Sequence, residues 1–287
     1  FSEVPADVLI LEVGLGGSYD ATNVINQPAL SVITPVDFDH KAFLGSDLRK
    51  IAGEKAGIIK PGCPALTAIQ RKVCDDVIAK RADEVGAPLY RLKAHFIDAM
   101  PEDLGLLGEH QRANAALAAM AVQLFGNSTV IDQDAIFEGA RNATWPARMQ
   151  RLKKGPVTDI VPGLEVWLDG GHNPHAARAI AKQLQGLPGK PALVTAMLAS
   201  KDSTGYFMPF REVRPDVFAL PNAPGHQGAD PQALAEAATN AGLKATACGS
   251  LEDAMTAAAA TGVDRILICG SLYLAGDVLA RNEELPT

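Results

Sequence analysis

From residue 166 onward, short runs of apolar and β-branched residues alternate with stretches of helical pattern. Strands separated by helices are typical of parallel βαβ units, because parallel strands need a long crossover connection. The alternation predicts an α/β, Rossmann-like domain with a parallel sheet. The predicted strands are 166–169, 192–197, 217–220, 244–248 and 265–269, and the predicted helices are 174–184, 204–213, 231–241, 251–260 and 272–281.

A similar but less regular series occupies the first half of the chain. The predicted strands are 7–13, 30–34, 65–69 and 88–92, and the predicted helices are 48–56, 72–85, 110–125 and 134–142. Between the two series lies TWPARMQRLKKGPVTDIVPGL, which is rich in proline, glycine and basic residues. A composition of this kind is typical of a linker, so we expect two domains, residues 1–147 and 148–287.

Composition excludes several classes of protein. The chain has 287 residues, of which 47% are hydrophobic and 21% charged, as in ordinary globular proteins. Its formal net charge of −7 argues against a general nucleic-acid binder. Apolar runs are too short to predict a membrane span. The four cysteines form no C-x-x-C pair, which indicates reduced thiols and a cytoplasmic protein.

The opening VLILEVGLGGSYDATN combines an apolar run, a carboxylate and a glycine-rich turn. Ligands of open α/β sheets bind at the carboxyl ends of strands, and a carboxylate there suits Mg²⁺. Glu12 is therefore a candidate metal ligand, or else it caps the following turn. A dinucleotide-binding fingerprint would require glycine where Tyr19 stands, which weakens a dehydrogenase interpretation.

Two further segments near this opening carry polar groups that could serve a metal or phosphate site. His40 lies in DFDHKAFLG, after the predicted strand 30–34. Its imidazole is either a metal ligand or the partner in a local hydrogen bond. Lys55 lies in GEKAGIIKPG near a predicted helix end, where a lysine beside Glu54 is ordinarily a solvated charge.

Four more motifs lie downstream. In GEHQRANAALAAM, the amide of Asn114 suits a purine edge, or is a surface amide of the helix. In WPARMQRL, the guanidinium of Arg148 suits phosphate. In WLDGGHNPHA, Asp169 ends a strand and Pro174 begins a helix. In CGSLYLAGDVL, Ser271 is a candidate ligand for a carboxylate at a helix N-terminus, or a plain helix cap.

Together and in this order, the motifs resemble the folylpolyglutamate synthase/dihydrofolate synthase family of the Mur ligase superfamily, along essentially the whole chain. The resemblance implies a P-loop-type ATPase domain followed by a smaller glutamate ligase domain, with the active site in the cleft between them. It also implies roles for individual residues: Glu12 and His40 as Mg²⁺ ligands, Lys55 as a carbamylated lysine, Asn114 against adenine, Arg148 against nucleotide phosphate or ribose, Asp169 on the ribose, His172 near phosphate and the incoming amino acid, and Ser271 on the glutamate carboxylate.

Two departures from the family pattern qualify these expectations. The phosphate-binding G-x-x-x-x-G-K-[ST] is absent, so we expect the chain to be the larger, C-terminal part of an enzyme. The family usually has GG-R-[LF]-DATN, whose arginine helps to hold the pterin, whereas this chain has Ser18 and Tyr19. These two residues are candidate substrate contacts, and the choice of pterin or folate stays open.

The implied activity is that of an ATP-dependent acid–amino-acid ligase using ATP and Mg²⁺. A carboxylate of dihydropteroate or a folate takes the γ-phosphoryl group of ATP and becomes an acyl phosphate, which the amine of L-glutamate attacks. We expect a monomer without nucleic-acid or membrane partners. The alternatives are another Mur-type ligase acting on a cell-wall nucleotide precursor, and an inactive, truncated nucleotide-binding protein.

Overall fold

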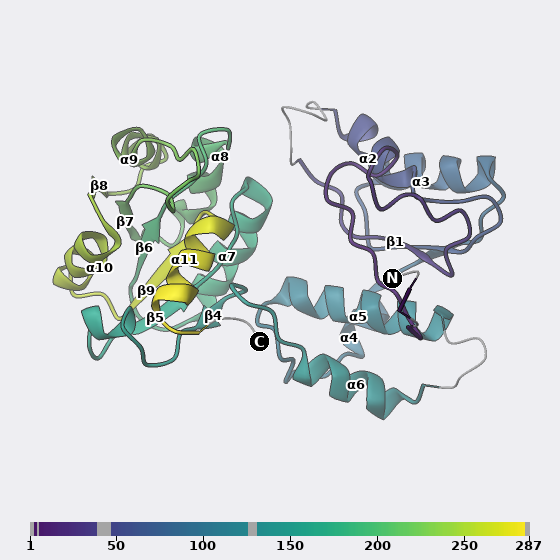
Figure 1. The fold of residues 1–287 in the computed structure, drawn as a ribbon, viewed down its shortest axis with the longest axis horizontal. Coiled ribbons are helices and arrows are strands. Elements are labelled where there is room, and N and C mark those ends of the chain that lie inside the picture. The colour runs from purple at the N-terminus through teal and green to yellow at the C-terminus, as the bar shows by residue number, and fades with distance from the viewer. Residues whose placement is uncertain (1–2, 5, 39–46, 126–130, 285–287) are drawn as a thin grey trace. The chain divides into compact units, whose positions relative to one another are not determined.

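The computed structural model describes residues 3–4, 6–38, 47–125 and 131–284. The chain divides into two compact units. Unit 1 comprises Phe1–Asp103 and Arg112–Arg141, and unit 2 comprises Leu104–Gln111 and Asn142–Thr287 (Figure 1). The boundary predicted at residue 148 lies just downstream of the second junction.

Unit 2 contains a six-stranded sheet in the order β4-β5-β9-β6-β7-β8. All neighbouring strands are parallel except β4, which pairs antiparallel with β5. The α/β class predicted for this half of the chain is therefore confirmed. The strands are β4 (Gln150–Arg151), β5 (Glu165–Leu168), β6 (Pro191–Thr195), β7 (Asp216–Ala219), β8 (Ala245–Ala247) and β9 (Arg265–Cys269).

Helices cover both faces of this sheet. On the central strand β9, Ile266 and Ile268 belong to the core under α10 and α11, whereas Leu267 and Cys269 belong to the core under α7, α8 and α9. A strand buried on both faces has a continuous apolar sequence, as β9 does. The helices are η1 (Thr158–Ile160), α7 (Pro174–Gly186), α8 (Ser203–Phe207), η2 (Met208–Arg211), α9 (Pro231–Asn240), α10 (Leu251–Ala260) and α11 (Leu272–Arg281).

The single helix predicted over 204–213 is instead the short helix α8 followed by the 3₁₀ helix η2. Pro209 lies in the first turn of η2. Proline has no backbone N–H and therefore cannot continue the hydrogen-bond ladder of an α-helix. The chain starts a new helical segment at this point.

Unit 1 contains a three-stranded parallel sheet in the order β1-β2-β3. Apolar residues of α2 and α3 pack with β1 and β2 in one core, which includes Ile33, Ile51 and Ile78. The elements are β1 (Ser31–Ile33), α2 (Leu48–Ala56), β2 (Ala65–Thr67), α3 (Lys72–Glu84), β3 (Leu89–Arg91), α4 (Ala94–Asp98), α5 (Glu109–Phe125) and α6 (Gln133–Asn142).

The strand predicted over 7–13 is wrong: these residues have no regular structure. The apolar side chains of Val8, Leu9 and Ile10 are exposed, Ile10 to 88%. A strand requires a neighbour that completes its ladder of hydrogen bonds. In the described part of unit 1, β1 pairs with β2 alone, so the run has no such neighbour there, and Glu12 does not stand at a strand tip.

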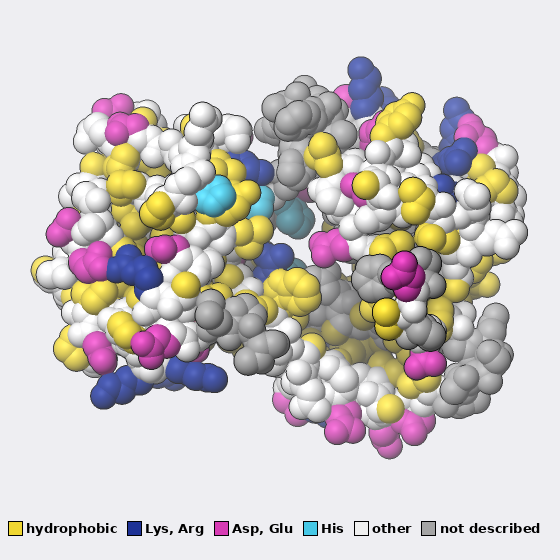
Figure 2. All heavy atoms as spheres, in the orientation of Figure 1, with side chains coloured by type: hydrophobic (Ala, Val, Ile, Leu, Met, Phe, Trp, Pro, Cys, Tyr) yellow, Lys and Arg dark blue, Asp and Glu magenta, His cyan; other side chains and the backbone are white. Residues whose placement is uncertain are grey.

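Within the described ranges, no helix has the length and apolarity needed to cross a bilayer. Cys74 and Cys269 are buried free thiols, whereas Cys63 and Cys248 are partly exposed free thiols. Figure 2 shows acidic side chains spread over the visible face of each unit, with basic ones among them.

The turn between β9 and α11 gives a test of this packing. Gly270 has φ +101°, and a Cβ there would lie 2.5 Å from both Ala196 O and Thr195 Oγ1. We expect Gly270→Ala to lower the free energy of unfolding by about 2 kcal/mol or more, measured by urea denaturation. Gly276→Ala is the matched control. It lies in α11 with open space around the position, and should raise stability by up to about 1 kcal/mol. Equal stabilities of the two variants would contradict the description of the turn.

Candidate functional site

The carboxylate of Asp169 lies directly after β5, at the carboxyl edge of the sheet in unit 2. The side chain is only 5% exposed. Its Oδ2 accepts a hydrogen bond from Met149 N (2.9 Å) and its Oδ1 accepts one from Gly171 N (2.7 Å). Burial raises the pKa of Asp169, while these two N–H donors and the charge of Arg148 oppose that shift.

Residues 147–150 approach Asp169 as a tight loop. Ala147 and Met149 both have left-handed backbone, with φ of +54° and +43°. Ala147 N donates to Gln150 Oε1 (2.9 Å), and Ala147 O accepts from Gly170 N (2.8 Å). Arg148 is exposed between these two buried neighbours. The backbone of the loop is therefore fixed, while its one guanidinium faces solvent.

The motif WLDGGHNPHA forms the predicted strand–turn–helix. Asn173 caps α7, with its Oδ1 accepting from Ala176 N (2.9 Å), and Pro174 occupies the first turn. A Cβ on Gly170 would lie 2.3 Å from the end of the exposed side chain of Leu272, which would have to move to accept it. His172 is partly exposed, and its Nδ1 lies 3.1 Å from Gly170 O.

His110, to which the motif analysis gave no ligand role, lies near both Arg148 and His175. Desolvation by the surrounding protein, then the charges of Arg148 and His175, lower the pKa of His110. Glu109, the first residue of α5, forms an ion pair with Lys182 of α7 within unit 2. The neighbourhood of Arg148 thus combines a permanent positive charge with imidazole groups that can donate hydrogen bonds to an anion. In the sequence, the one sign that His110 belongs to the site was its position in the motif GEHQRANAALAAM, which was singled out for Asn114.

Ser271 begins α11, as predicted. It is 2% exposed, and its Oγ accepts from Tyr273 N (3.2 Å) and Leu274 N (3.4 Å). These bonds fill the role of a helix cap. Contact between Ser271 and a glutamate carboxylate stays a prediction.

In unit 1, Asp20 organises the glycine-rich turn. Its Oδ2 accepts from Gly14 N (3.0 Å) and Leu15 N (2.9 Å), and its Oδ1 accepts from the backbone N and the hydroxyl of Thr22 (2.9 and 2.6 Å). The hydroxyl of Thr22, followed by these N–H groups, lowers the pKa of Asp20 to about 2. The DATN segment therefore shapes its loop, as its residue types suggest.

The same turn packs against the last turn of α2. Ser18 donates from its N and its Oγ to Glu54 O (2.9 and 3.2 Å). A Cβ on Gly17 would lie 2.4 Å from Glu54 O, so a larger residue cannot take its place. The structure thus brings the glycine-rich turn next to the helix that carries Lys55. Ser18 faces this helix, whereas Tyr19 is 93% exposed.

The remaining predicted site residues stay predictions. Glu12 is exposed immediately before the glycine-rich turn, and Asn114 is exposed on α5 in unit 1. His40 lies outside the described residues. In the ranges that the structure describes, no group of three His, Cys, Asp or Glu side chains could hold a metal ion.

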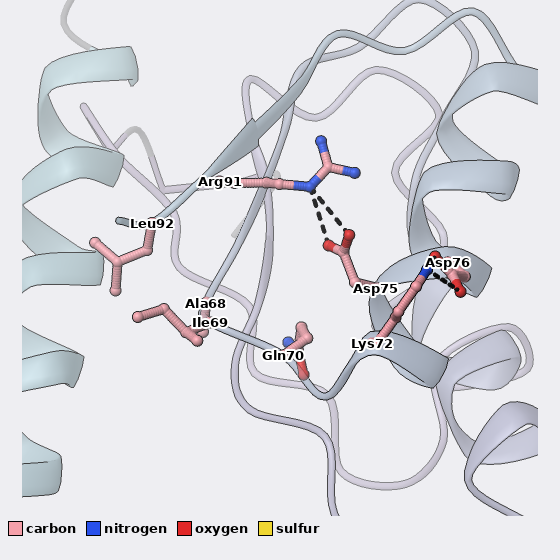
Figure 3. Close-up of a pocket in the computed structure, with 8 residues that line it drawn as sticks. All are labelled: Ala68, Ile69, Gln70, Lys72, Asp75, Asp76, Arg91 and Leu92. Carbon is pink, nitrogen blue, oxygen red and sulfur yellow. Dashed lines mark hydrogen bonds and ion pairs between the residues drawn. The ribbon is translucent and has the colours of Figure 1, made fainter. Parts of the chain in front are cut away.

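A pocket of about 410 Å³ lies at the carboxyl ends of β2 and β3 in unit 1. Figure 3 shows Arg91 pointing to Asp75 and Lys72 to Asp76, with apolar residues opposite. The nitrogen–oxygen distances of these ion pairs are 3.0 and 2.8 Å. All four charged groups that line the pocket are therefore paired with one another. None of the predicted site residues lines it.

The carboxylate of Asp20 gives a direct test of the glycine-rich turn. Asp20→Asn replaces one acceptor oxygen by a donor, so the amides of Gly14 and Leu15 should exchange hydrogen faster at pH 7. Because the pKa is lowered from 3.8 to about 2, the bonds formed by the carboxylate are present above pH 3.8 and are lost as the pH falls through 2.

The difference in exchange between wild type and variant should therefore narrow as the pH falls from 4 towards 2, measured by hydrogen exchange with mass spectrometry. Asp47→Asn is the control, because Asp47 caps α2 elsewhere in unit 1. It should leave the rates at Gly14 and Leu15 unchanged. Equal exchange in wild type and Asp20→Asn at pH 7 would refute the assignment.

Residues 147–272 match the family model "Mur ligase, glutamate ligase domain". The chain is 37% identical over 213 residues to dihydrofolate synthase/folylpolyglutamate synthase of Mycobacterium tuberculosis, covering 64% of this chain and 42% of that protein. It is 31% identical over 302 residues to folylpolyglutamate synthase of Lacticaseibacillus casei, covering 97% and 67%.

Among solved structures, Mycobacterium tuberculosis folylpolyglutamate synthase complexed with ADP and AMPPCP superposes with a TM-score of 0.87 at 30% identity. That alignment covers 100% of this chain and 71% of the other. The matches to five mammalian and bacterial relatives span between 34% and 45% of the relatives' length. The chain belongs to the folylpolyglutamate synthase/dihydrofolate synthase family of Mur ligases.

Proposed function

We propose that this chain is the nucleotide- and glutamate-handling part of an ATP-dependent ligase that joins L-glutamate to a folate. The observation that carries the proposal is the cluster at the carboxyl edge of the sheet in unit 2. There the buried carboxylate of Asp169 holds a loop that presents Arg148, with His110 and His175 nearby. Membership of the family supplies the reaction class.

This cluster suits a nucleotide. The exposed guanidinium of Arg148 can bind phosphate through two parallel hydrogen bonds. The backbone N–H groups at the start of α7, next to His172, add a second group of anion donors. Asp169 offers carboxylate oxygens for a ribose hydroxyl. Asn114, which belongs to unit 1, keeps its proposed role of offering an amide to the adenine edge.

The proposed chemistry is amide formation. A carboxylate of dihydropteroate or of a folate accepts the γ-phosphoryl group of ATP, and ADP leaves. The amine of L-glutamate attacks the carbonyl carbon of this acyl phosphate, phosphate leaves, and an amide bond remains. His172 and Ser271 would receive the phosphate and the glutamate carboxylate. Ser18 and Tyr19 would touch the pterin or folate. Because these two residues replace the arginine and its apolar neighbour that the family usually has, the identity of the pterin or folate stays open.

Glu12 and His40 would hold Mg²⁺. The exposed carboxylate of Glu12 fits the preference of this ion for oxygen ligands and water. Mg²⁺ would neutralise charge on the transferring phosphoryl group. A carbamylated Lys55 would add an anion beside the glycine-rich turn that packs on α2.

Substrate competition tests the proposed function. ATP consumption by the complete product of the reading frame that contains this chain should depend on dihydropteroate or tetrahydrofolate plus L-glutamate. The same consumption with UDP-linked muropeptides instead would favour a cell-wall ligase. No consumption with either substrate class would favour an inactive nucleotide-binding protein.

Arg148→Ala should raise the KM for ATP by about tenfold or more, equivalent to ~1.4 kcal/mol, and leave the KM for glutamate within about twofold. Arg151→Ala is the matched control. Arg151, in β4, pairs with Glu165 at 3.0 Å, so its loss should leave both constants unchanged. A change in the KM for glutamate alone would make the assignment of Arg148 wrong.

Glu12→Gln should abolish Mg²⁺-dependent turnover because an amide is a much poorer ligand for this ion. The thermal midpoint should stay the same, since the side chain is exposed. Asp7→Asn removes a nearby exposed carboxylate and should leave turnover intact. Full activity of Glu12→Gln would remove Glu12 from the metal site.

A further inference from the structure

We infer that Asp169 is a positioning residue for Arg148: its carboxylate holds residues 147–149 in the one backbone conformation that presents the guanidinium. This inference deepens the proposed function by assigning Asp169 a role that acts through the loop, in addition to any contact with nucleotide. It rests on the hydrogen bonds that join residues 147–149 to residues 169–171.

The carboxylate bridges two segments that are far apart in sequence. One oxygen accepts from Met149 N and the other accepts from Gly171 N. Gly170 N also donates a backbone hydrogen bond to Ala147 O (2.8 Å), so each segment donates to the other at this junction. With both oxygens engaged and only 5% of the residue exposed, the carboxylate is an integral part of this junction.

The loop needs such a restraint because its conformation is unfavourable by itself. Ala147 and Met149 are L-residues in the left-handed region, which costs roughly 1–2 kcal/mol for each. Ala147 packs into the core under α10 and α11, whereas Met149 packs into the core under α7, α8 and α9. Arg148 is thus the residue between two anchors on opposite faces of the sheet. Loss of the bond to Met149 N would let the loop relax to ordinary backbone angles and redirect Arg148.

Hydrogen exchange of the Met149 amide in the 287-residue chain tests the restraint without requiring ligase activity. In the wild type, the Met149 amide should exchange at least about tenfold more slowly than an unprotected amide. Asp169→Asn, which leaves one acceptor oxygen for two donors, should remove most of this protection. Asp264→Asn is the matched control: Asp264 accepts the backbone N–H of Lys190 (2.6 Å) elsewhere in unit 2, and its loss should leave Met149 protected.

Two outcomes of this experiment overturn the inference. The first is an unprotected Met149 amide in the wild type. This outcome needs no variant, so it remains decisive even if Asp169→Asn fails to fold. The second is unchanged protection of the Met149 amide in a folded Asp169→Asn variant.

A double-mutant cycle then tests whether Asp169 acts through Arg148. The affinity for ATP is measured for wild type, Asp169→Asn, Arg148→Ala and the double variant. We expect Asp169→Asn to weaken ATP binding less in the Arg148→Ala background than in the wild type, because the part of its effect that acts through the guanidinium is then gone and only a direct contact with the nucleotide remains. Losses that multiply would show that Asp169 acts independently of Arg148 and would overturn the inference. Absence of ATP binding in the wild type would instead refute the proposed function, and the exchange experiment would still decide the inference.

Discussion

A single buried carboxylate determines how the site in unit 2 is built. Asp169 takes its place from β5, whose hydrogen bonds to β9 fix the end of the strand, and it then binds the backbone of two other segments. Burial alone would favour the neutral form of this group. The N–H donors and the nearby guanidinium favour the charged form and so oppose this effect, although burial is the larger cause and the pKa of Asp169 is raised.

The fold of unit 2 could be predicted because each local signal agrees with the long-range packing. The apolar run Arg265–Cys269 forms a central strand because helices cover both of its faces. Pro174 and Asn173 mark the start of α7 by chemistry that acts within one turn. Prediction failed where the outcome depends on a distant partner or on one residue. The run at 7–13 has the composition of a strand but no neighbouring strand in the described part, and Pro209 divides a segment that is otherwise helical in pattern.

The residues of the candidate site could be predicted in part, whereas the conformation of the loop that carries Arg148 could not. The motifs located Asp169 at the end of a strand, Arg148 in the linker and Ser271 at a helix start, because these motifs are local. Sequence gave no sign of the left-handed pair that flanks Arg148, since alanine and methionine rarely adopt this conformation. It also missed the proximity of His110 to Arg148 and to His175, because these residues come from three separate segments that only the folded unit brings together.

The most direct test of the central claim is a titration of the 287-residue chain with MgATP, followed through the backbone amide chemical shifts. The account predicts that the largest shifts occur at Met149, Gly170, Gly171 and the first residues of α7, and that they saturate together. Shifts confined to the pocket between β3 and α3, or absent from the loop around Arg148, would contradict a nucleotide site organised by Asp169.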